Sequence, residues 1–111
     1  MAAEQITLEE FARLDIRVGK VIKAERVPGA RKLLRLEVDL GEPEPRQLVA
    51  GLAGFYEPEE LVGMNVVVLA NLKPKRIMGV ESRGMLLAAD VDGRPVLLTT
   101  AEGVPPGTRV R

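Results

Sequence analysis

The sequence predicts an all-β protein, in which a five-stranded barrel has a short helix between strands 3 and 4 and is flanked by an N-terminal helix and a C-terminal β extension. Apolar residues alternate with polar ones, or form short β-branched runs, in segments separated by turns rich in Pro and Gly. The 111 residues are the length of a single domain. We therefore expect one domain over residues 1–111, with the barrel at about residues 14–91.

The N-terminal helix is predicted by Thr7 and Glu10, which have the spacing of a capping box. The first strand follows as DIRVGKVIKAERV, and its apolar residues change faces beyond Gly19. A glycine at such a change predicts a bulge or a sharp coil, which a strand needs when it closes a barrel. Pro28 and Gly29 end this strand.

The second strand, LLRLEVDLG, has the clearest alternation, because Leu34, Leu36, Val38 and Leu40 all point one way. RQLVAG is the third strand. A short helix is expected next in PEELVG, where a proline suits the first helical position and glutamates suit its positive end. MNVVVLANL then forms a fourth strand that is buried on both faces.

Residues 73–84 are expected to form a long loop, and GMLLAADV to form the fifth strand. Asp92-Gly93 is a hairpin turn signal that leads into PVLLTT. The remaining tail is expected to end in a short β-like segment. Five strands with one helix between the third and the fourth are the order of an OB-fold barrel.

Charge is segregated along a chain whose net charge is zero. Residues 12–36 carry a net charge of +6, residues 37–61 one of −6 and residues 73–85 one of +3. Such runs are commonly only solvated faces. In an OB fold, however, the loops after strands 1 and 4 flank the nucleic-acid face. Here those loops, residues 28–33 and 73–84, are both basic, which favours a surface for a polyanion.

Catalysis, metals and cofactors find little support in the composition. The chain has no His and no Cys, and its only serine, Ser82, has no recognisable base beside it. No phosphate-binding glycine loop has the required spacing, and no secretory leader or membrane-length apolar run is present. We therefore expect a soluble cytoplasmic protein that is not an enzyme and carries no metal or cofactor.

Five sequence blocks resemble the structure-specific tRNA-binding domain that is attached to bacterial methionyl-tRNA synthetases and also occurs as a stand-alone protein and in endothelial-monocyte-activating polypeptides. The resemblance runs from about residue 6 to the C-terminus, and the blocks are FARLDIRVGKV, KLLRLEVDLG, VAGL, VVVLANLKP and MGVESRGMLLAA. It implies an OB fold that binds the outer corner of tRNA without reading the anticodon. In the bacterial forms it also implies a homodimer.

The resemblance implies that RNA-contacting residues lie in the first loop, in the fourth-strand loop and in the ESRGM block; these are Lys32, Lys73, Lys75, Arg76, Ser82 and Met85. Arg83 departs from the family pattern, which has an acid there, and its charge should favour phosphate. Arg35 alternates with apolar residues and is a further candidate, although an outward position on the strand explains it equally well. With at most Tyr56 free to stack, the protein should read backbone and shape rather than bases.

The ends of the chain predict a dimer or a folded-back tail. The apolar C-terminal segment would expose strand edges if it stood alone. It can fold over its own barrel, or it can form an isologous interface with the N-terminal helix, as the resemblance suggests. The expected interface residues are Leu8, Phe11, Val96, Leu97, Leu98, Val104 and Val110.

Three functions stay open at this point. The first is an independent tRNA-binding protein, which Met1 and the short leading segment favour. The second is a subunit or appended domain of methionyl-tRNA synthetase, which would bind the catalytic chain. The third is a peptide-binding secretion chaperone of the same fold, which would prefer unfolded polypeptide to tRNA.

Overall fold

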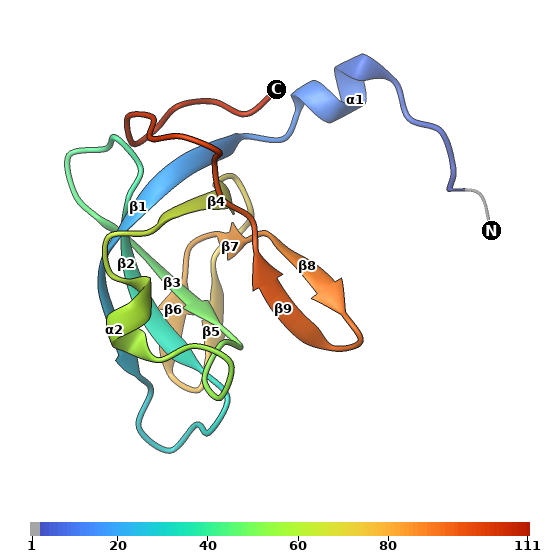
Figure 1. Cartoon of the computed structure of the whole chain (residues 1–111). Helices are drawn as coiled ribbons and strands as arrows, with labels where there is room; N and C mark the ends of the chain where they lie inside the picture. The colour runs from blue at the N-terminus through green and yellow to red at the C-terminus, as the bar shows by residue number, and fades with distance from the viewer. Residues whose placement is uncertain (1–2) are drawn as a thin grey trace.

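The computed structural model describes residues 3–111, which form a β barrel with two hairpins and two short helices (Figure 1). The elements in chain order are α1 Leu8–Ala12, β1 Ile16–Arg26, β2 Leu34–Asp39, β3 Arg46–Ala50, α2 Pro58–Leu61, β4 Asn65–Leu69, β5 Lys75–Ile77, β6 Val80–Ser82, β7 Met85–Leu86, β8 Ala88–Val91 and β9 Arg94–Leu97.

The barrel is a five-stranded antiparallel sheet with the strand order β3-β2-β1-β4-β7. It is nearly closed between β3 and the β6–β7 segment, where the backbone N–H of Arg83 donates to the carbonyl oxygen of Gln47 at 2.9 Å. Helix α2 lies between β3 and β4 and begins with Pro58 after the N-cap Glu57, as the sequence indicates. The prediction of an OB-type barrel is confirmed.

Strand β1 is coiled enough to pair with two strands in succession. Its first half, Ile16–Lys20, pairs with β4, and its second half, from Lys20 to Arg26, pairs with β2. The bulge predicted at Gly19 lies instead between Val21 and Lys23. Gly19 has a different role, because a Cβ there would lie 2.5 Å from Val38 Cγ1, so that β1 could not cross β2 as closely.

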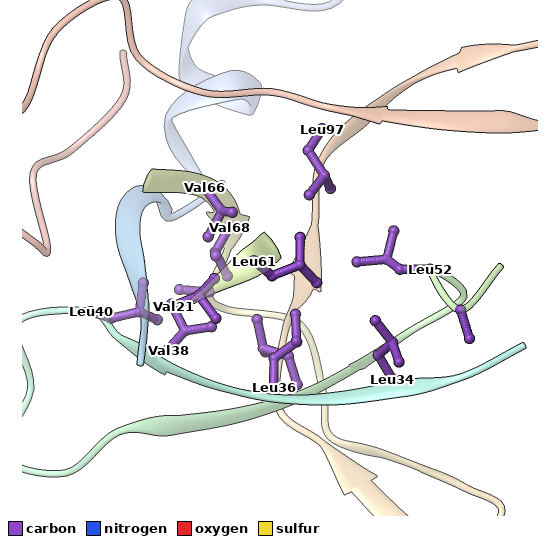
Figure 2. Packing of buried hydrophobic residues seen from close by; sticks show 13 residues of the cluster. Val21, Leu34, Leu36, Val38, Leu40, Leu52, Leu61, Val66, Val68 and Leu97 are labelled. Carbon is purple, nitrogen blue, oxygen red and sulfur yellow. The ribbon is translucent and has the colours of Figure 1, made fainter. Parts of the chain in front are cut away.

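The core fills the barrel interior with aliphatic side chains (Figure 2). The inward residues of β2 alternate as predicted, and Val66, Val67 and Val68 of β4 are all buried. Leu97 of β9 also points into this core, toward Leu52 and Leu61 (Figure 2), and is 8% exposed. The C-terminal hairpin therefore contributes a side chain to the barrel core.

Two segments differ from the sequence-based predictions. Residues 73–84 are not a loop throughout, because β5 and β6 form a hairpin inside them whose turn residues, Met78 and Gly79, have φ angles of 52° and 79°. The expected fifth strand is also divided, since β7 pairs with β4 whereas β8 turns away and pairs with β9. The turn between β8 and β9 is at Asp92-Gly93, as predicted, with φ angles of 50° and 84°.

The C-terminal tail returns to the barrel and lines the free edge of β1. The N–H of Val18 donates to Thr108 at 2.8 Å, and the N–H of Val110 donates to Ile16 at 2.8 Å. Helix α1 stands away from the barrel beside the C-terminus and buries none of its residues (Figure 1). Within residues 3–111, no helix has the length and apolar character to cross a membrane.

Candidate functional site

Two basic segments and the end of β3 converge on one side of the barrel. Ala53, just after β3, donates its N–H to the carbonyl oxygen of Lys32 at 3.2 Å, which fixes the β1–β2 loop against this strand end. Gly51 from the same strand end lines a hollow together with Lys73 and Lys75. The β1–β2 loop, which carries Lys32, and the segment with Lys73 and Lys75 therefore both adjoin the end of β3.

We call this depression the apolar hollow. It has a volume of about 480 Å³ and opens between β3, the β5–β6 hairpin and the β8–β9 hairpin. Among the described residues 3–111, the charged residues that line it are Lys73 and Lys75. Its exposed or partly exposed apolar walls include Leu72, Ile77, Met85, Leu86, Ala88 and Pro95.

Strand alternation divides the predicted basic cluster. Lys75 and Ile77 share the face of β5 that lines the hollow, whereas Arg76 lies on the other face, opposite Glu81. Arg76 also bends back to the hairpin tip, where Nη1 donates to Gly79 O at 2.7 Å. Lys73, Lys75 and Arg76 form no ion pair among residues 3–111. Only the two lysines, however, border the hollow.

Ser82 lines the hollow, and its hydroxyl forms hydrogen bonds with other residues of the barrel. It is 5% exposed, and its Oγ accepts from Val49 N at 3.0 Å while donating to Gly84 O at 3.1 Å. Because β3 and β6 do not pair through a regular ladder here, the hydroxyl replaces a missing backbone partner. We therefore assign Ser82 to barrel closure, which positions the hairpin.

Arg35 is held among partners on the outer face of β2. Its guanidinium donates to Glu25 at 2.7 Å, to Glu37 at 3.1 Å and to Gln47 Oε1 at 2.8 Å. The hydrogen bond to Glu25 is the main reason why the pKa of Arg35 is raised and that of Glu25 is lowered. Gln47 in turn donates to Glu81 O at 2.8 Å, so Arg35 orients the amide that anchors β6.

Arg83 faces the outside of the barrel near acidic residues rather than the hollow. Its carbonyl oxygen accepts from Arg46 Nη1 at 2.8 Å, and the same nitrogen donates to Ala70 O at 2.7 Å. Arg46 also forms two bonds with Glu42, at 3.1 and 2.7 Å. These bonds are the largest cause of the lowered pKa of Glu42, to which the charge of Arg83 contributes a little.

The structure brings together only part of the predicted RNA-contacting set. Lys73, Lys75 and Met85 line the hollow, and Lys32 lies on the adjoining loop. Arg35, Arg76 and Arg83 lie elsewhere on the barrel. Sequence reasoning missed the apolar wall from the β8–β9 hairpin, because Ala88 was placed in the fifth barrel strand, Pro95 was placed beyond it, and neither residue carries a charge. It also missed the anchoring roles of Arg46 and Gln47, for which no sequence signal exists.

The predicted interface residues are also divided. Leu97 is buried in its own barrel, Val96 of β9 is half-buried, and Leu98 is 42% exposed. Val104 and Val110 are half-buried along the returning tail. Leu8 is 81% exposed, and it lines a second hollow of about 320 Å³ with Phe11, Leu14 and Val110. An apolar surface therefore remains where α1 meets the C-terminus.

Aromatic side chains take different places from those predicted. Phe55 is 50% exposed on the loop after β3. Tyr56 is half-buried, and its hydroxyl accepts from Leu97 N at 3.2 Å. Tyr56 therefore secures the β8–β9 hairpin, and Phe55 is the aromatic side chain that this loop presents to solvent.

Comparison with known proteins points to one family. The model of the tRNA binding domain family matches residues 16–109. Methionine–tRNA ligase from Archaeoglobus fulgidus is 59% identical over 107 residues, which cover 96% of this chain but 16% of the ligase. The chain spans less than a fifth of the length of such relatives, as the Thermotoga maritima ligase also shows, with 54% identity and 18% of its length covered.

Solved structures with the same fold include small proteins that this chain matches from end to end. A MetRS related protein from Pyrococcus horikoshii has a TM-score of 0.91 and 42% identity, with 98% of this chain and 100% of that chain covered. Chaperone CsaA from Bacillus anthracis has a TM-score of 0.87 and 35% identity, with 97% and 100% covered.

Proposed function

Because the chain belongs to the tRNA binding domain family, we propose that it is a non-catalytic protein that binds folded tRNA with the face around the apolar hollow. One observation carries the proposal. Lys73 and Lys75 border the hollow, and within residues 3–111 neither forms an ion pair. Lysine ammonium groups that are not engaged in ion pairs can donate charge-assisted hydrogen bonds to phosphate oxygens.

Recognition of tRNA shape follows from how these cations are held. Lys32 lies on the β1–β2 loop, whereas Lys73 and Lys75 precede and begin the β5–β6 hairpin. The barrel sets the backbone positions of these two segments, through the bond between Ala53 N–H and the carbonyl oxygen of Lys32 and through the anchoring of β6 by Ser82 and Gln47. Cations with a fixed spacing match phosphates that a folded RNA also holds at a fixed spacing. A disordered RNA strand gains less binding free energy from such a surface.

The arginines on the outer barrel play a smaller part in this proposal. Arg35 is already compensated by Glu25 and Glu37, so its transfer to a phosphate would leave carboxylates unpaired. Arg76 and Arg83 add positive charge around the hairpin and support long-range attraction of RNA. We also infer a cytoplasmic location, which the proposed role with tRNA supports.

A peptide-binding chaperone is the second candidate function. The apolar hollow could accept an apolar side chain of an unfolded polypeptide, and the similarity to chaperone CsaA favours this alternative. A role as part of methionine–tRNA ligase is compatible with tRNA binding, since the relatives carry this sequence in a minor part of their length.

The deciding experiment is a competition assay with labelled folded tRNA at fixed ionic strength. Unlabelled folded tRNA, denatured tRNA, duplex RNA and a reduced unfolded polypeptide would compete in parallel. We expect folded tRNA to compete most strongly and the polypeptide least. The chaperone alternative gains if the polypeptide displaces tRNA as well as tRNA itself does.

We further propose a homodimer formed through α1 and the C-terminal end of the chain. Helix α1 buries no residue against its own barrel, and Ile6 and Leu8 are 62% and 81% exposed. Exposed aliphatic residues beside the second hollow form the kind of surface that soluble proteins cover. A two-fold dimer would cover it and would place two lysine faces on one particle.

A further inference from the structure

The apolar hollow has more apolar wall than phosphate binding needs. A surface that binds only phosphate needs cations and backbone N–H groups, which a flat patch can present. Here Leu72, Ile77 and Met85 join Ala88 and Pro95 from a different hairpin to enclose about 480 Å³ beside the two lysines. Leu72 and Met85 remain 44% and 46% exposed, so the walls are open to a ligand.

The charge pattern defines what the occupant must be. Within residues 3–111, no Asp or Glu lines the hollow, and its two lysines lie just before β5 (Lys73) and at its first residue (Lys75). An occupant with an apolar body and an anionic group at one side satisfies both features. A nucleotide has this arrangement, because its base has two apolar faces and its phosphates follow at the sugar.

Hydrogen-bonding groups inside the hollow are few. The side chains that line it and carry polar atoms are Lys73, Lys75 and Ser82. The Ser82 hydroxyl is already used as acceptor and donor by Val49 and Gly84. A base in the hollow would therefore be held by its faces rather than read by its edge, so any of the four bases could enter.

We propose that the apolar hollow receives one unstacked base of the bound RNA, while Lys73 and Lys75 hold the phosphates beside that base. The inference rests on the proposed function and specifies how this face holds RNA. Met85 and Leu86 of β7, with Ala88 and Pro95 of the β8–β9 hairpin, are among the apolar residues that would contact the base. Aliphatic and thioether side chains take the place that aromatic residues have in other single-strand sites.

The test fills the hollow without changing its charge. Ala88→Met extends a side chain into the hollow from the exposed strand β8, and Ala89→Met makes the same change at the next residue, which does not line the hollow. Lys73→Ala is the third variant. Each variant would be titrated with folded tRNA, with a short oligouridylate, and with an abasic ribose-phosphate strand of the same length and charge. Circular dichroism and thermal melts would verify that each variant folds.

We expect the unmodified protein to bind the oligouridylate about tenfold more tightly than the abasic strand, which is within the range for one stacked base. Ala88→Met should abolish this preference and weaken folded tRNA binding, and Ala89→Met should change neither. Lys73→Ala should weaken the binding of the oligouridylate and of the abasic strand equally. These results together would support the inference.

Three outcomes would overturn it. If Ala88→Met binds folded tRNA and the oligouridylate as the unmodified protein does, the hollow holds no base, although tRNA binding itself stands. If the unmodified protein binds folded tRNA but does not distinguish oligouridylate from the abasic strand, the same conclusion follows. If it binds unfolded polypeptide instead of tRNA, and Ala88→Met blocks that binding, then the proposed function fails as well and the occupant is a peptide side chain.

Discussion

Ser82 Oγ accepts a hydrogen bond from the backbone N–H of Val49 at 3.0 Å, and this bond joins β6 to β3 where the barrel closes. Since Ser82 is buried, Ser82→Ala would leave that N–H without a partner and should lower the free energy of unfolding by about 1–3 kcal/mol. Urea denaturation would measure the change, with Thr108→Ala, an exposed hydroxyl, as the control. A variant of normal stability that loses tRNA binding would show that the hydroxyl contacts RNA instead.

The two faces of β5 allow a matched comparison between Lys75 and Arg76. Lys75 lines the apolar hollow, whereas Arg76 lies on the opposite face of the same hairpin. Lys75→Ala should therefore weaken the binding of folded tRNA several-fold. Arg76→Ala should weaken this binding less, because only the substitution at Lys75 removes a phosphate contact. Fluorescence anisotropy with labelled tRNA would measure both. If Arg76→Ala proves the more damaging change, the binding face is on the outer side of the hairpin.

The ion pair between Glu42 and Arg46 gives the stability a dependence on pH. Hydrogen bonds from Arg46 hold the pKa of Glu42 below its ordinary value of 4.5. A carboxylate whose folded pKa is lowered stabilises the fold above the unfolded pKa, and this contribution is lost as pH falls through the folded pKa. Glu42→Gln should therefore lower the free energy of unfolding near neutral pH. The difference in this free energy between the variant and the unmodified protein should shrink on acidification below about pH 4.5.

Urea denaturation at a series of pH values would test this, with Glu44→Gln as the control. Glu44 is exposed and forms no ion pair among the described residues 3–111. The control should follow the unmodified protein at every pH. A constant difference between Glu42→Gln and the unmodified protein across the acid range would refute the assignment to Glu42.

The dimer proposal is tested at Leu8, which is 81% exposed and supports no core packing within its own chain. Leu8→Asp should give a monomer with unchanged thermal stability of the barrel, and Val62→Asp, at another exposed aliphatic residue, should leave the dimer intact. Sedimentation at micromolar concentration would measure both. Deleting residues 92–111 is a poorer test, because it removes Leu97 from the core. An unmodified protein that sediments as a monomer would refute the dimer.

Local sequence signals predicted most of the barrel. Alternation in β2 and the β-branched run in β4 identify strands because they reflect which side chains are buried. Pro58 and the Asp92-Gly93 pair mark a helix start and a hairpin turn because each restricts the backbone at its own position. The basic loops were predicted to flank one face. The β1–β2 loop, which carries Lys32, and the segment with Lys73 and Lys75 both adjoin the end of β3, and their contact with RNA stays a prediction.

The errors came from features that depend on tertiary contacts. The β5–β6 turn has Met78 at φ 52°, a conformation that residues other than Gly and Asn seldom adopt, so the segment resembled a loop. The division between β7 and β8, which pair with β4 and β9 respectively, accompanies the entry of Leu97 into the core, and no local pattern reveals either feature. The sequence also could not show that Ser82 and Arg35 form hydrogen bonds within the barrel, because their partners come from other strands.

The most direct test of the central claim is the salt dependence of folded tRNA binding, compared between the unmodified protein and the double variant Lys73→Ala, Lys75→Ala. If both lysines neutralise phosphates, the slope of log affinity against log salt concentration should decrease in magnitude by about 1.4–1.8 in the double variant, since each phosphate contact contributes about 0.7–0.9 to that slope. Its affinity should also fall at every salt concentration. An unchanged slope, or an affinity that does not depend on salt in either protein, would contradict the account.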